Sequence, residues 1–306
     1  MKPKVVLLGL AALTLLASSA LLLHHRPRSL QAAAAPAQTF QVHGQVRGIA
    51  PADKTIRIAH EAIPNYMPAM TMSLPVKDAA LLEHLAVGDE VQFELAVTAD
   101  DSWVSHIEKL PTAAAGSRTE PKESASLEEL EAGRLRTGES VPDFQLTDQD
   151  GRLIHLHDFR GQAVVLTFIY TRCPLPNFCP LMSKNFSELE QRLHKEFPNK
   201  YHLLSISMDP EFDRPEVLKE YAARYEADAK DWSFTVADAG SLNFVAGLVG
   251  LYFEKENGLI SHDLRTALIG PDGRLVQLWK SNLWTPYEVQ RSVRETLTGH
   301  ADVAAR

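Results

Sequence analysis

The sequence predicts two domains, a small all-β barrel of the OB type followed by an α/β thioredoxin-like domain. Short alternating strand patterns fill residues 39–111, and apolar runs alternate with helical patterns over residues 131–300. Residues 112–130 lack apolar periodicity and are interpreted as a linker. A chain of 306 residues is long enough for two modest domains that each bury a core.

Residues 1–38 precede the first domain and carry the pattern of an export signal and a tether. Lys2 and Lys4 stand before an apolar run at residues 5–23, which is a positive region followed by a hydrophobic stretch. The run is about long enough to cross a bilayer as a helix. The small residues at 32–37 also offer a cleavage site. We therefore expect an exported protein, either anchored in the membrane by residues 5–23 or released after cleavage.

The net charge and the cysteine content limit the classes of ligand and chemistry that the chain can have. A formal charge of −8 argues against a nucleic-acid-binding surface, which needs a basic footprint. The chain has two cysteines, Cys173 and Cys179, and they lie close together. In an oxidising compartment two such thiols readily form a disulfide.

The first domain is predicted to contain five short strands separated by turn residues. Alternation places Ile56, Ile58 and His60 on one face of a strand. Five strands within residues 39–111 predict a small closed barrel of the OB type. The expected strands are residues 39–47, 54–60, 69–75, 90–97 and 103–110.

The second domain starts with a short helical stretch at residues 127–135 and then alternates strands with helices. Residues 163–170 form a continuous apolar run, as expected of a buried central strand. Thr285 and Pro286 predict the N-cap and first position of a last helix. The resulting β-α-β-α-β-β-α order is the thioredoxin arrangement. The expected strands are 142–146, 153–156, 163–170, 202–208, 265–269 and 274–279, with helices at 182–197, 215–226 and from 286 onward.

Three of the six methionines, Met67, Met70 and Met72, fall in one short segment of the barrel. Met70 and Met72 are two apart on a strand, so their thioethers point to the same side. His60 ends the preceding strand. Thioether sulfur selects Cu(I) or Ag(I) over hard cations, and imidazole is compatible with copper. Methionines also simply fill cores, so the residues alone leave that interpretation open.

Residues 60–72 read His-Glu-Ala-Ile-Pro-Asn-Tyr-Met-Pro-Ala-Met-Thr-Met. This segment resembles the Cu(I) and Ag(I) site of the CusF-like periplasmic metallochaperones, and the likeness extends through Gly88-Asp89 to the end of the barrel. The resemblance implies that His60, Met70 and Met72 bind the ion. The family usually has Trp before the proline; Met67 stands there, either as a third sulfur ligand or as a cap.

The cysteine loop follows directly on the buried strand and reads Cys173-Pro-Leu-Pro-Asn-Phe-Cys179-Pro180. Pro180 suits the first position of a helix, which places Cys179 near the helix N-terminus. The free N–H groups and the macrodipole there favour a thiolate. Two thiolates on one short loop can chelate a soft metal or interconvert with a disulfide, and an inert structural disulfide is the remaining alternative.

The second domain resembles the Sco/SenC family of copper proteins, which serve cytochrome oxidase assembly, over roughly residues 130–298. The shared motifs are Thr-x-Cys-Pro at 171–174, a second Cys-Pro at 179–180, Ser-x-Asp-Pro at 207–210, and a His eight residues before the first Gly of Gly-Pro-Asp-Gly at 270–273. The resemblance implies that His262 joins Cys173 and Cys179 as ligands of Cu(I), with Cu(II) as a second candidate ion.

The second domain departs from the family at two points. Five residues separate the cysteines where the family has three, and Ser261 stands where Asp is usual. The longer loop still allows both sulfurs to reach one copper, but it equally shifts the balance toward disulfide chemistry.

Two copper-type sites on one chain predict a periplasmic, non-enzymatic metallochaperone. Its partners would be an envelope protein that accepts or donates copper, such as a cytochrome oxidase subunit, and a thiol–disulfide reductant. The alternative is a periplasmic thiol–disulfide oxidoreductase that acts on partner cysteines. Thioredoxin-type enzymes carry a proline opposite the cysteine pair, and residues 259–270 contain none. Tyr170 and Leu166 occupy the Thr/Ser and Pro positions of a peroxiredoxin, which excludes that class.

Overall fold

The computed structural model describes residues 37–111 and 131–303. The described residues belong to one compact unit. The predicted export segment at residues 5–23 and the predicted linker at 112–130 lie outside the described residues. Among the helices of the described part, none is long and apolar enough to cross a membrane.

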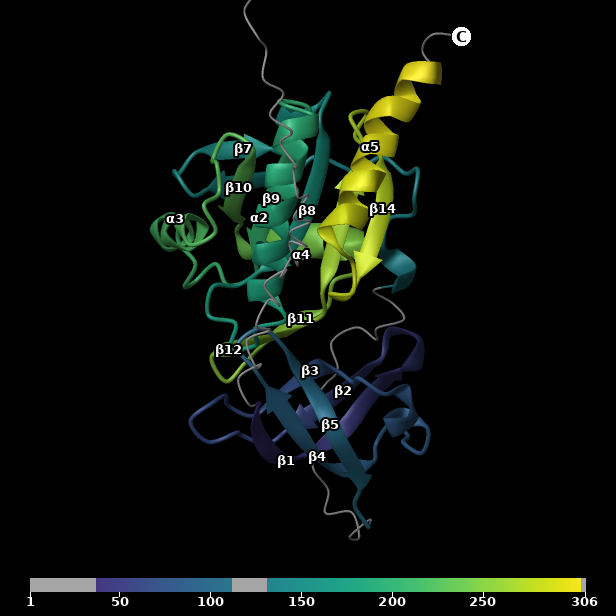
Figure 1. Ribbon diagram of the computed structural model, residues 1–306. Coiled ribbons are helices and arrows are strands. Elements are labelled where there is room, and N and C mark those ends of the chain that lie inside the picture. Colours follow the sequence, from purple (N-terminus) through teal and green to yellow (C-terminus); the bar gives the residue numbers. More distant parts are fainter. Residues whose placement is uncertain (1–36, 112–130, 304–306) are drawn as a thin grey trace, which may run out of the picture. The chain divides into compact units, whose positions relative to one another are not determined.

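The first domain is an all-β sheet of five antiparallel strands in the order β3-β2-β1-β4-β5 (Figure 1). A parallel bridge between Val76 and Val104 joins the two edges, so the sheet closes as a small barrel. Alternate residues point inward and are fully buried, among them Ile56, Ile58 and Phe93. The strands are β1 (Gln38–Ala50), β2 (Thr55–His60), β3 (Met70–Pro75), β4 (Glu90–Val97) and β5 (Ser102–Lys109), with 3-10 turns at Pro51–Asp53 and Ala79–Leu82.

Strand β1 is long because it pairs with β2 on one side and with β4 on the other. Gly44 lies opposite His60 in this pairing. A Cβ at Gly44 would lie 2.5 Å from Cγ2 of Ile58 and 2.7 Å from the carbonyl oxygen of Ala59. Glycine at this position therefore allows the close approach that positions the end of β2, where His60 lies.

The second domain is built on a seven-stranded sheet in the order β14-β13-β8-β9-β10-β6-β7, which confirms the predicted α/β thioredoxin-like class. Every residue of the central strand β8 (Ala163–Ile169) is buried, as the apolar run predicts. The other strands of this sheet are β6 (Gln145–Asp148), β7 (Leu153–His155), β9 (Tyr201–Ser207), β10 (Trp232–Val236), β13 (Arg265–Ile269) and β14 (Leu275–Lys280), and a 3-10 turn spans Leu156–Phe159.

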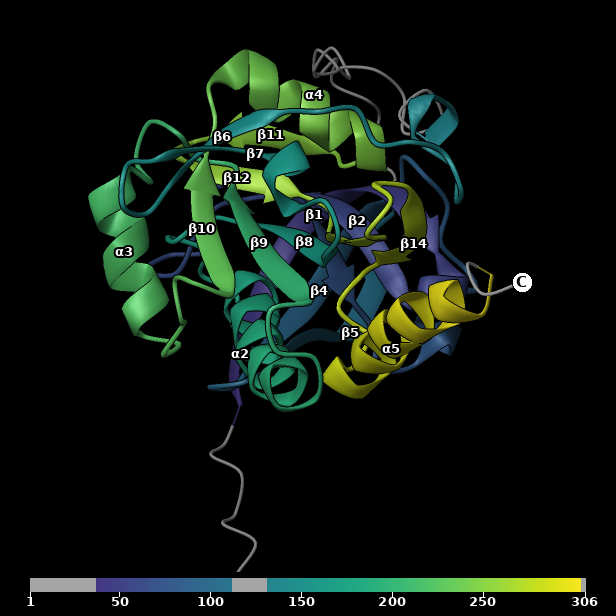
Figure 2. The same ribbon diagram turned by 90° about the horizontal axis from the view of Figure 1, so that it is seen from above.

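Helices cover both faces of this sheet (Figures 1 and 2). Helices α2 (Cys179–Glu196) and α5 (Pro286–Val303) lie side by side on one face, and α4 (Ala239–Val249) lies on the other. Helix α3 (Pro215–Ala223) packs beside β10. The N–H of Glu288 donates to Oγ1 of Thr285 at 3.3 Å, and the N–H of Thr285 donates to the Glu288 carboxylate at 2.7 Å. This reciprocal cap confirms the predicted start of α5.

The sequence patterns did not predict β10, α4 or the small hairpin of β11 (Phe253–Glu256) and β12 (Leu259–His262). Helix α4 contains two glycines and lacks a polar face, so its apolar period is weak; its boundaries are set by the Asp238 cap and by Gly250 at φ 63°. Of the helical stretch expected at residues 127–135, residues 131–135 are described: 131–133 are helical, and 134–135 are not, so the helix ends two residues earlier than predicted.

Candidate metal centre

The cysteine loop connects the end of β8 to the start of α2. Helix α2 begins at Cys179 with Pro180 in its first turn, as the sequence predicts. The backbone N–H of Tyr170 donates to Sγ of Cys179 at 3.4 Å, and Cys179 is fully buried. Cys173 is half-buried, and its thiol points toward the carbonyl oxygen of Leu175 at 3.8 Å. Both cysteines are free thiols.

His262, the last residue of β12, lies against this loop. Its Nε2 is 3.7 Å from Sγ of Cys179. The ligand atoms of Cys173, Cys179 and His262 all lie within 4.8 Å of one another. The structure thus brings His262 to two cysteines that lie more than eighty positions earlier in the chain.

The imidazole of His262 is held in one orientation. Its Nδ1 donates to the carbonyl oxygen of Asp263 at 2.8 Å, and because a carbonyl only accepts, the proton of the neutral ring is on Nδ1. The rings of Tyr170 and Phe178 meet it edge-on, with centroids at 5.6 and 5.9 Å. The lone pair of Nε2 is therefore directed toward the two sulfurs, which is the arrangement a metal-binding histidine requires.

The two thiols differ in acidity. Burial alone raises a thiol pKa, but the neighbouring Cys179 thiol and the His262 imidazole bring the pKa of Cys173 well below its ordinary range. Burial and then the adjacent Cys173 raise the pKa of Cys179 well above its ordinary range. The sequence predicts a thiolate at Cys179; the pair instead favours it at Cys173, because Cys179 and His262 lower the pKa of Cys173, whereas burial and the neighbouring Cys173 raise the pKa of Cys179.

A buried carboxylate that the sequence analysis missed fixes the start of the cysteine loop. Asp213 is fully buried and accepts hydrogen bonds from the backbone N–H of Thr171 at 3.0 Å and from the hydroxyl of Ser207 at 2.6 Å. The hydroxyl of Thr171 donates to the same carboxylate. Asp213 therefore ties the Thr-x-Cys-Pro segment to the Ser-x-Asp-Pro segment at the end of β9. The nearest signal in the sequence is its position shortly after that second motif.

In the barrel, His60 is oriented in the same way as His262. Its Nδ1 donates to the carbonyl oxygen of Glu61 at 2.6 Å. Its Nε2 is buried and has no hydrogen-bond partner within the described residues. Burial lowers the pKa of His60 below its ordinary 6.5, so the ring is neutral at pH 7. An unpaired buried lone pair is costly, and this atom is open to a ligand.

Two of the barrel methionines, Met70 and Met72, lie on the same face as His60. Met70 is paired with His60 across β2 and β3, so their side chains share a face, and Met72 follows two positions later on that face. All three methionines are buried. A tight turn, with hydrogen bonds between Ile63 and Met67 at 2.8 and 3.0 Å, holds Met67 in place. The donor set of one imidazole and several thioethers suits a soft monovalent ion.

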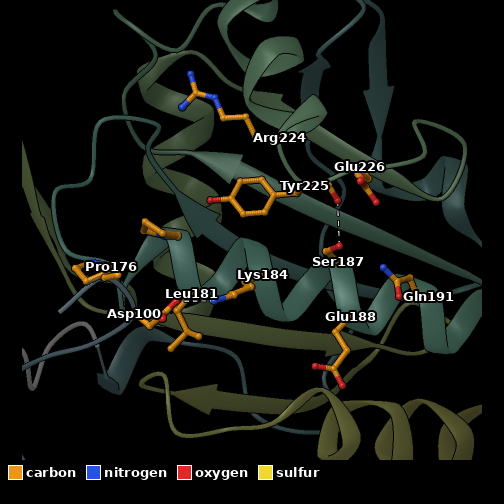
Figure 3. Close-up of a pocket in the computed structure, with 12 residues that line it drawn as sticks. Asp100, Pro176, Leu181, Lys184, Ser187, Glu188, Gln191, Arg224, Tyr225 and Glu226 are labelled. Carbon is orange, nitrogen blue, oxygen red and sulfur yellow. Dashed lines mark hydrogen bonds and ion pairs between the residues drawn. The ribbon is translucent and has the colours of Figure 1, made fainter. Parts of the chain in front are cut away.

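A separate, open groove of about 560 Å³ lies along α2 (Figure 3). The Lys184 ammonium pairs with Asp100 at 2.7 Å, and the Ser187 hydroxyl donates to the backbone carbonyl of Tyr225 at 3.0 Å. Its lining contains no cysteine, histidine or methionine. The groove therefore offers no soft donor, in contrast to the two clusters described above.

Comparisons with known proteins give one family match for each of the two domains. The family model SCO1/SenC matches residues 133–298, and the model described as copper binding periplasmic protein CusF matches residues 39–109. A SCO1 protein homolog of Bacillus subtilis (strain 168) is 29% identical over 152 residues, which cover 48% of this chain and 77% of that protein.

Two solved structures are similar to the second domain. The copper-bound structure of Bradyrhizobium japonicum ScoI is 26% identical with a TM-score of 0.45, and the match covers 52% of this chain and all of that one. A structure of BsSco is 27% identical with a TM-score of 0.46, covering 52% of this chain and 94% of that chain. BsSco is described there as a member of the Sco family of cytochrome c oxidase assembly proteins.

Proposed function

Since the chain belongs to the SCO1/SenC family, we propose that it is a copper metallochaperone of the cell envelope, with copper as its cargo. The observation that carries the proposal is the cluster of Cys173, Cys179 and His262, whose donor atoms lie within 4.8 Å of one another. Two thiolates and one imidazole form a soft donor set that suits Cu(I). Cu(II) is the second ion that this set can hold.

The second proposed site is formed by His60, Met70 and Met72 in the barrel, with Met67 as an additional sulfur ligand. The match of this domain to the CusF family supports it. The buried and unpaired Nε2 of His60 supports it independently, because a copper ion would supply the missing partner. These ligands need no reduction, so this site binds Cu(I) in an oxidising compartment.

The partners follow from the chemistry of the cargo. Delivery of copper to a cytochrome oxidase subunit is the proposed role, in line with the family to which BsSco is assigned. A thiol–disulfide reductant keeps Cys173 and Cys179 able to bind the ion. We place the protein on the periplasmic side of the envelope, anchored by residues 5–23 or released after cleavage.

Anaerobic Cu(I) titration of the full-length, reduced protein tests the two-site proposal. The parent is expected to bind two equivalents. A Met70→Leu/Met72→Leu variant and a Cys173→Ser/Cys179→Ser variant are each expected to lose one, because each removes the sulfur ligands of one site at nearly constant volume. If the methionine variant retains both equivalents with parental affinity, the proposed barrel site is wrong.

A thiol–disulfide oxidoreductase is the second candidate function. The favouring observation is the unequal pair of thiols, with a half-buried Cys173 of lowered pKa and a fully buried Cys179 of raised pKa. An accessible thiolate next to a resolving thiol is the arrangement that attacks a partner disulfide. Rapid reduction of a model disulfide by a protein that binds no copper at this site would favour the enzyme.

A further inference from the structure

A small enclosed cavity of about 10 Å³ lies beside the cysteine loop and is lined by residues of both domains. The second domain contributes Cys173 and His262, with Tyr170 and Phe178 around them, and the barrel contributes Met72. A space of this size holds about one small particle such as a single ion or water. A soft donor of the barrel site therefore faces the same space as two donors of the cysteine site.

The strand that carries the methionines is joined to the hairpin that carries His262. Strand β3 lies against β12. The hydroxyl of Ser73 donates to the Asp263 carboxylate at 3.1 Å, and the side-chain amide of Asn257 donates to the carbonyl oxygen of Ala69 at 2.5 Å. The backbone N–H of Thr71 donates to Glu256. These bonds hold Met72 and His262 on facing elements.

The cysteine loop is tied to the barrel as well. Asn177, which lies between the cysteines, is buried and donates to the carbonyl oxygen of Ser102 at 2.8 Å and to the Asp101 carboxylate at 3.2 Å. The hydroxyl of Ser102 donates back to the amide oxygen of Asn177. The hydroxyl of Tyr66 donates to the carbonyl oxygen of Pro174 at 3.3 Å. The longer spacing between the cysteines thus provides a residue that docks on the barrel.

We infer that Cu(I) passes directly from the barrel to the cysteine site by ligand exchange at the cavity that Met72 shares with Cys173 and His262, without release into solvent. This inference rests on the proposed function. The bonds from copper to the thioethers and to His60 break as bonds to the two cysteine sulfurs and Nε2 of His262 form. Copper remains Cu(I), and any thiol proton that is displaced passes to water. Transfer runs toward the cysteines because anionic thiolates attract a cation more strongly than neutral thioethers.

The test uses the full-length protein with Cys173 and Cys179 first oxidised to a disulfide, so that one equivalent of Cu(I) occupies the barrel alone. A phosphine then reduces the disulfide in the presence of bicinchoninate, which forms a coloured complex with released Cu(I). The chelator is used at concentrations that leave the oxidised, loaded protein intact over the same time. Direct transfer predicts that the captured fraction stays low and does not rise with chelator concentration.

An undocking variant shows whether the contacts between the domains matter. It combines Tyr66→Phe, Ser73→Ala and Ser102→Ala, which remove three hydroxyl donors that cross between the domains. The matched control combines Tyr225→Phe, Ser105→Ala and Ser187→Ala, whose hydroxyls bond within one domain. Docking keeps the cysteine site, which accepts the copper, at an effective concentration on the order of millimolar near the barrel. The undocked variant should therefore lose roughly tenfold more copper to the chelator than the parent or the control.

The result that overturns the inference is a captured fraction that rises with chelator concentration in the parent and equals that of the undocked variant. Even if the triple variant does not fold, the dependence of the parent's captured fraction on chelator concentration still tests direct transfer. Cu(I) titrations of the oxidised and reduced protein, done beforehand, distinguish a failure of direct transfer from a failure of the proposed function. If both sites bind copper but all of it passes through the chelator, direct transfer is wrong and the proposed function stands. If the barrel binds none, direct transfer and the barrel site are wrong; if the cysteine site binds none, the proposed function is wrong as well.

Discussion

His60 and His262 belong to different domains, but the same kind of hydrogen bond orients both imidazoles. Each donates its Nδ1–H to the backbone carbonyl of the following residue, at 2.6 and 2.8 Å, which leaves Nε2 as the nitrogen available to a metal. The sequence indicates both as metal ligands only through spacing and resemblance, because hydrogen bonding to a neighbouring carbonyl leaves no pattern in the sequence. The shared geometry is the reason to expect that both bind as neutral imidazoles.

At the residue scale, His262→Ala should separate copper binding from thiol chemistry. Loss of one of three ligands is expected to weaken Cu(I) binding at the cysteine site by about 100-fold or more, while the Cys173–Cys179 reduction potential changes little. Competition titration against a chelator and equilibration with a thiol redox buffer measure the two quantities. His106→Ala is the control, because it removes an exposed imidazole from the barrel surface. Normal copper affinity in His262→Ala would remove His262 from the site.

The two sites should also respond differently to pH. The raised pKa of Cys179 means that its thiol proton must be displaced when copper binds, whereas the lowered pKa of Cys173 favours its thiolate. Affinity of the cysteine site should therefore fall about tenfold for each unit of acidification. Burial lowers the pKa of His60 below 6.5, so the barrel site should be independent of pH down to 6.5 and weaken only below it. Cu(I) titrations at several pH values measure both dependences. If log affinity at the cysteine site changes twice as steeply with pH, release of a single proton on binding is wrong.

At the scale of elements, the sequence predicts those that have a clear period and flanking turns. The five barrel strands and the central strand β8 lie close to their predicted positions. The hairpin β11–β12 was missed because its strands are only four residues long and partly exposed, too short to show alternation. Yet this hairpin places His262, so the candidate ligand was found from its spacing while the element that positions it was not.

Gly44→Ala tests whether the close approach of β1 and β2 sets the barrel site. The added methyl group would lie 2.5 Å from Ile58, so the strands must separate near His60. We expect a loss of about 1–3 kcal/mol in the stability of the barrel, together with weaker Cu(I) binding there. Gly48→Ala is the matched control on the same strand, since its nearest neighbour is at an ordinary 3.5 Å. Thermal melts followed by circular dichroism and Cu(I) titrations measure both; equal effects of the two substitutions would contradict the account.

At the scale of the whole molecule, the sequence predicts two domains and two clusters of soft donors but no relation between the clusters. From the sequence, the five-residue spacing of the cysteines is compatible with copper binding and with disulfide chemistry alike. In the structure the longer loop also presents Asn177 to Asp101 and Ser102 of the barrel. Contacts between residues more than seventy positions apart have no local signature, so only the folded chain reveals them.

In the proposed function, the barrel carries a copper site that is independent of redox state, and the second domain carries one that requires reduced cysteines. The most direct measurement is the number of Cu(I) equivalents that the full-length protein retains anaerobically with Cys173 and Cys179 as a disulfide and as thiols. We expect one equivalent for the disulfide form and two for the reduced form, because a disulfide has no thiolate to donate. The same number in both forms would contradict it.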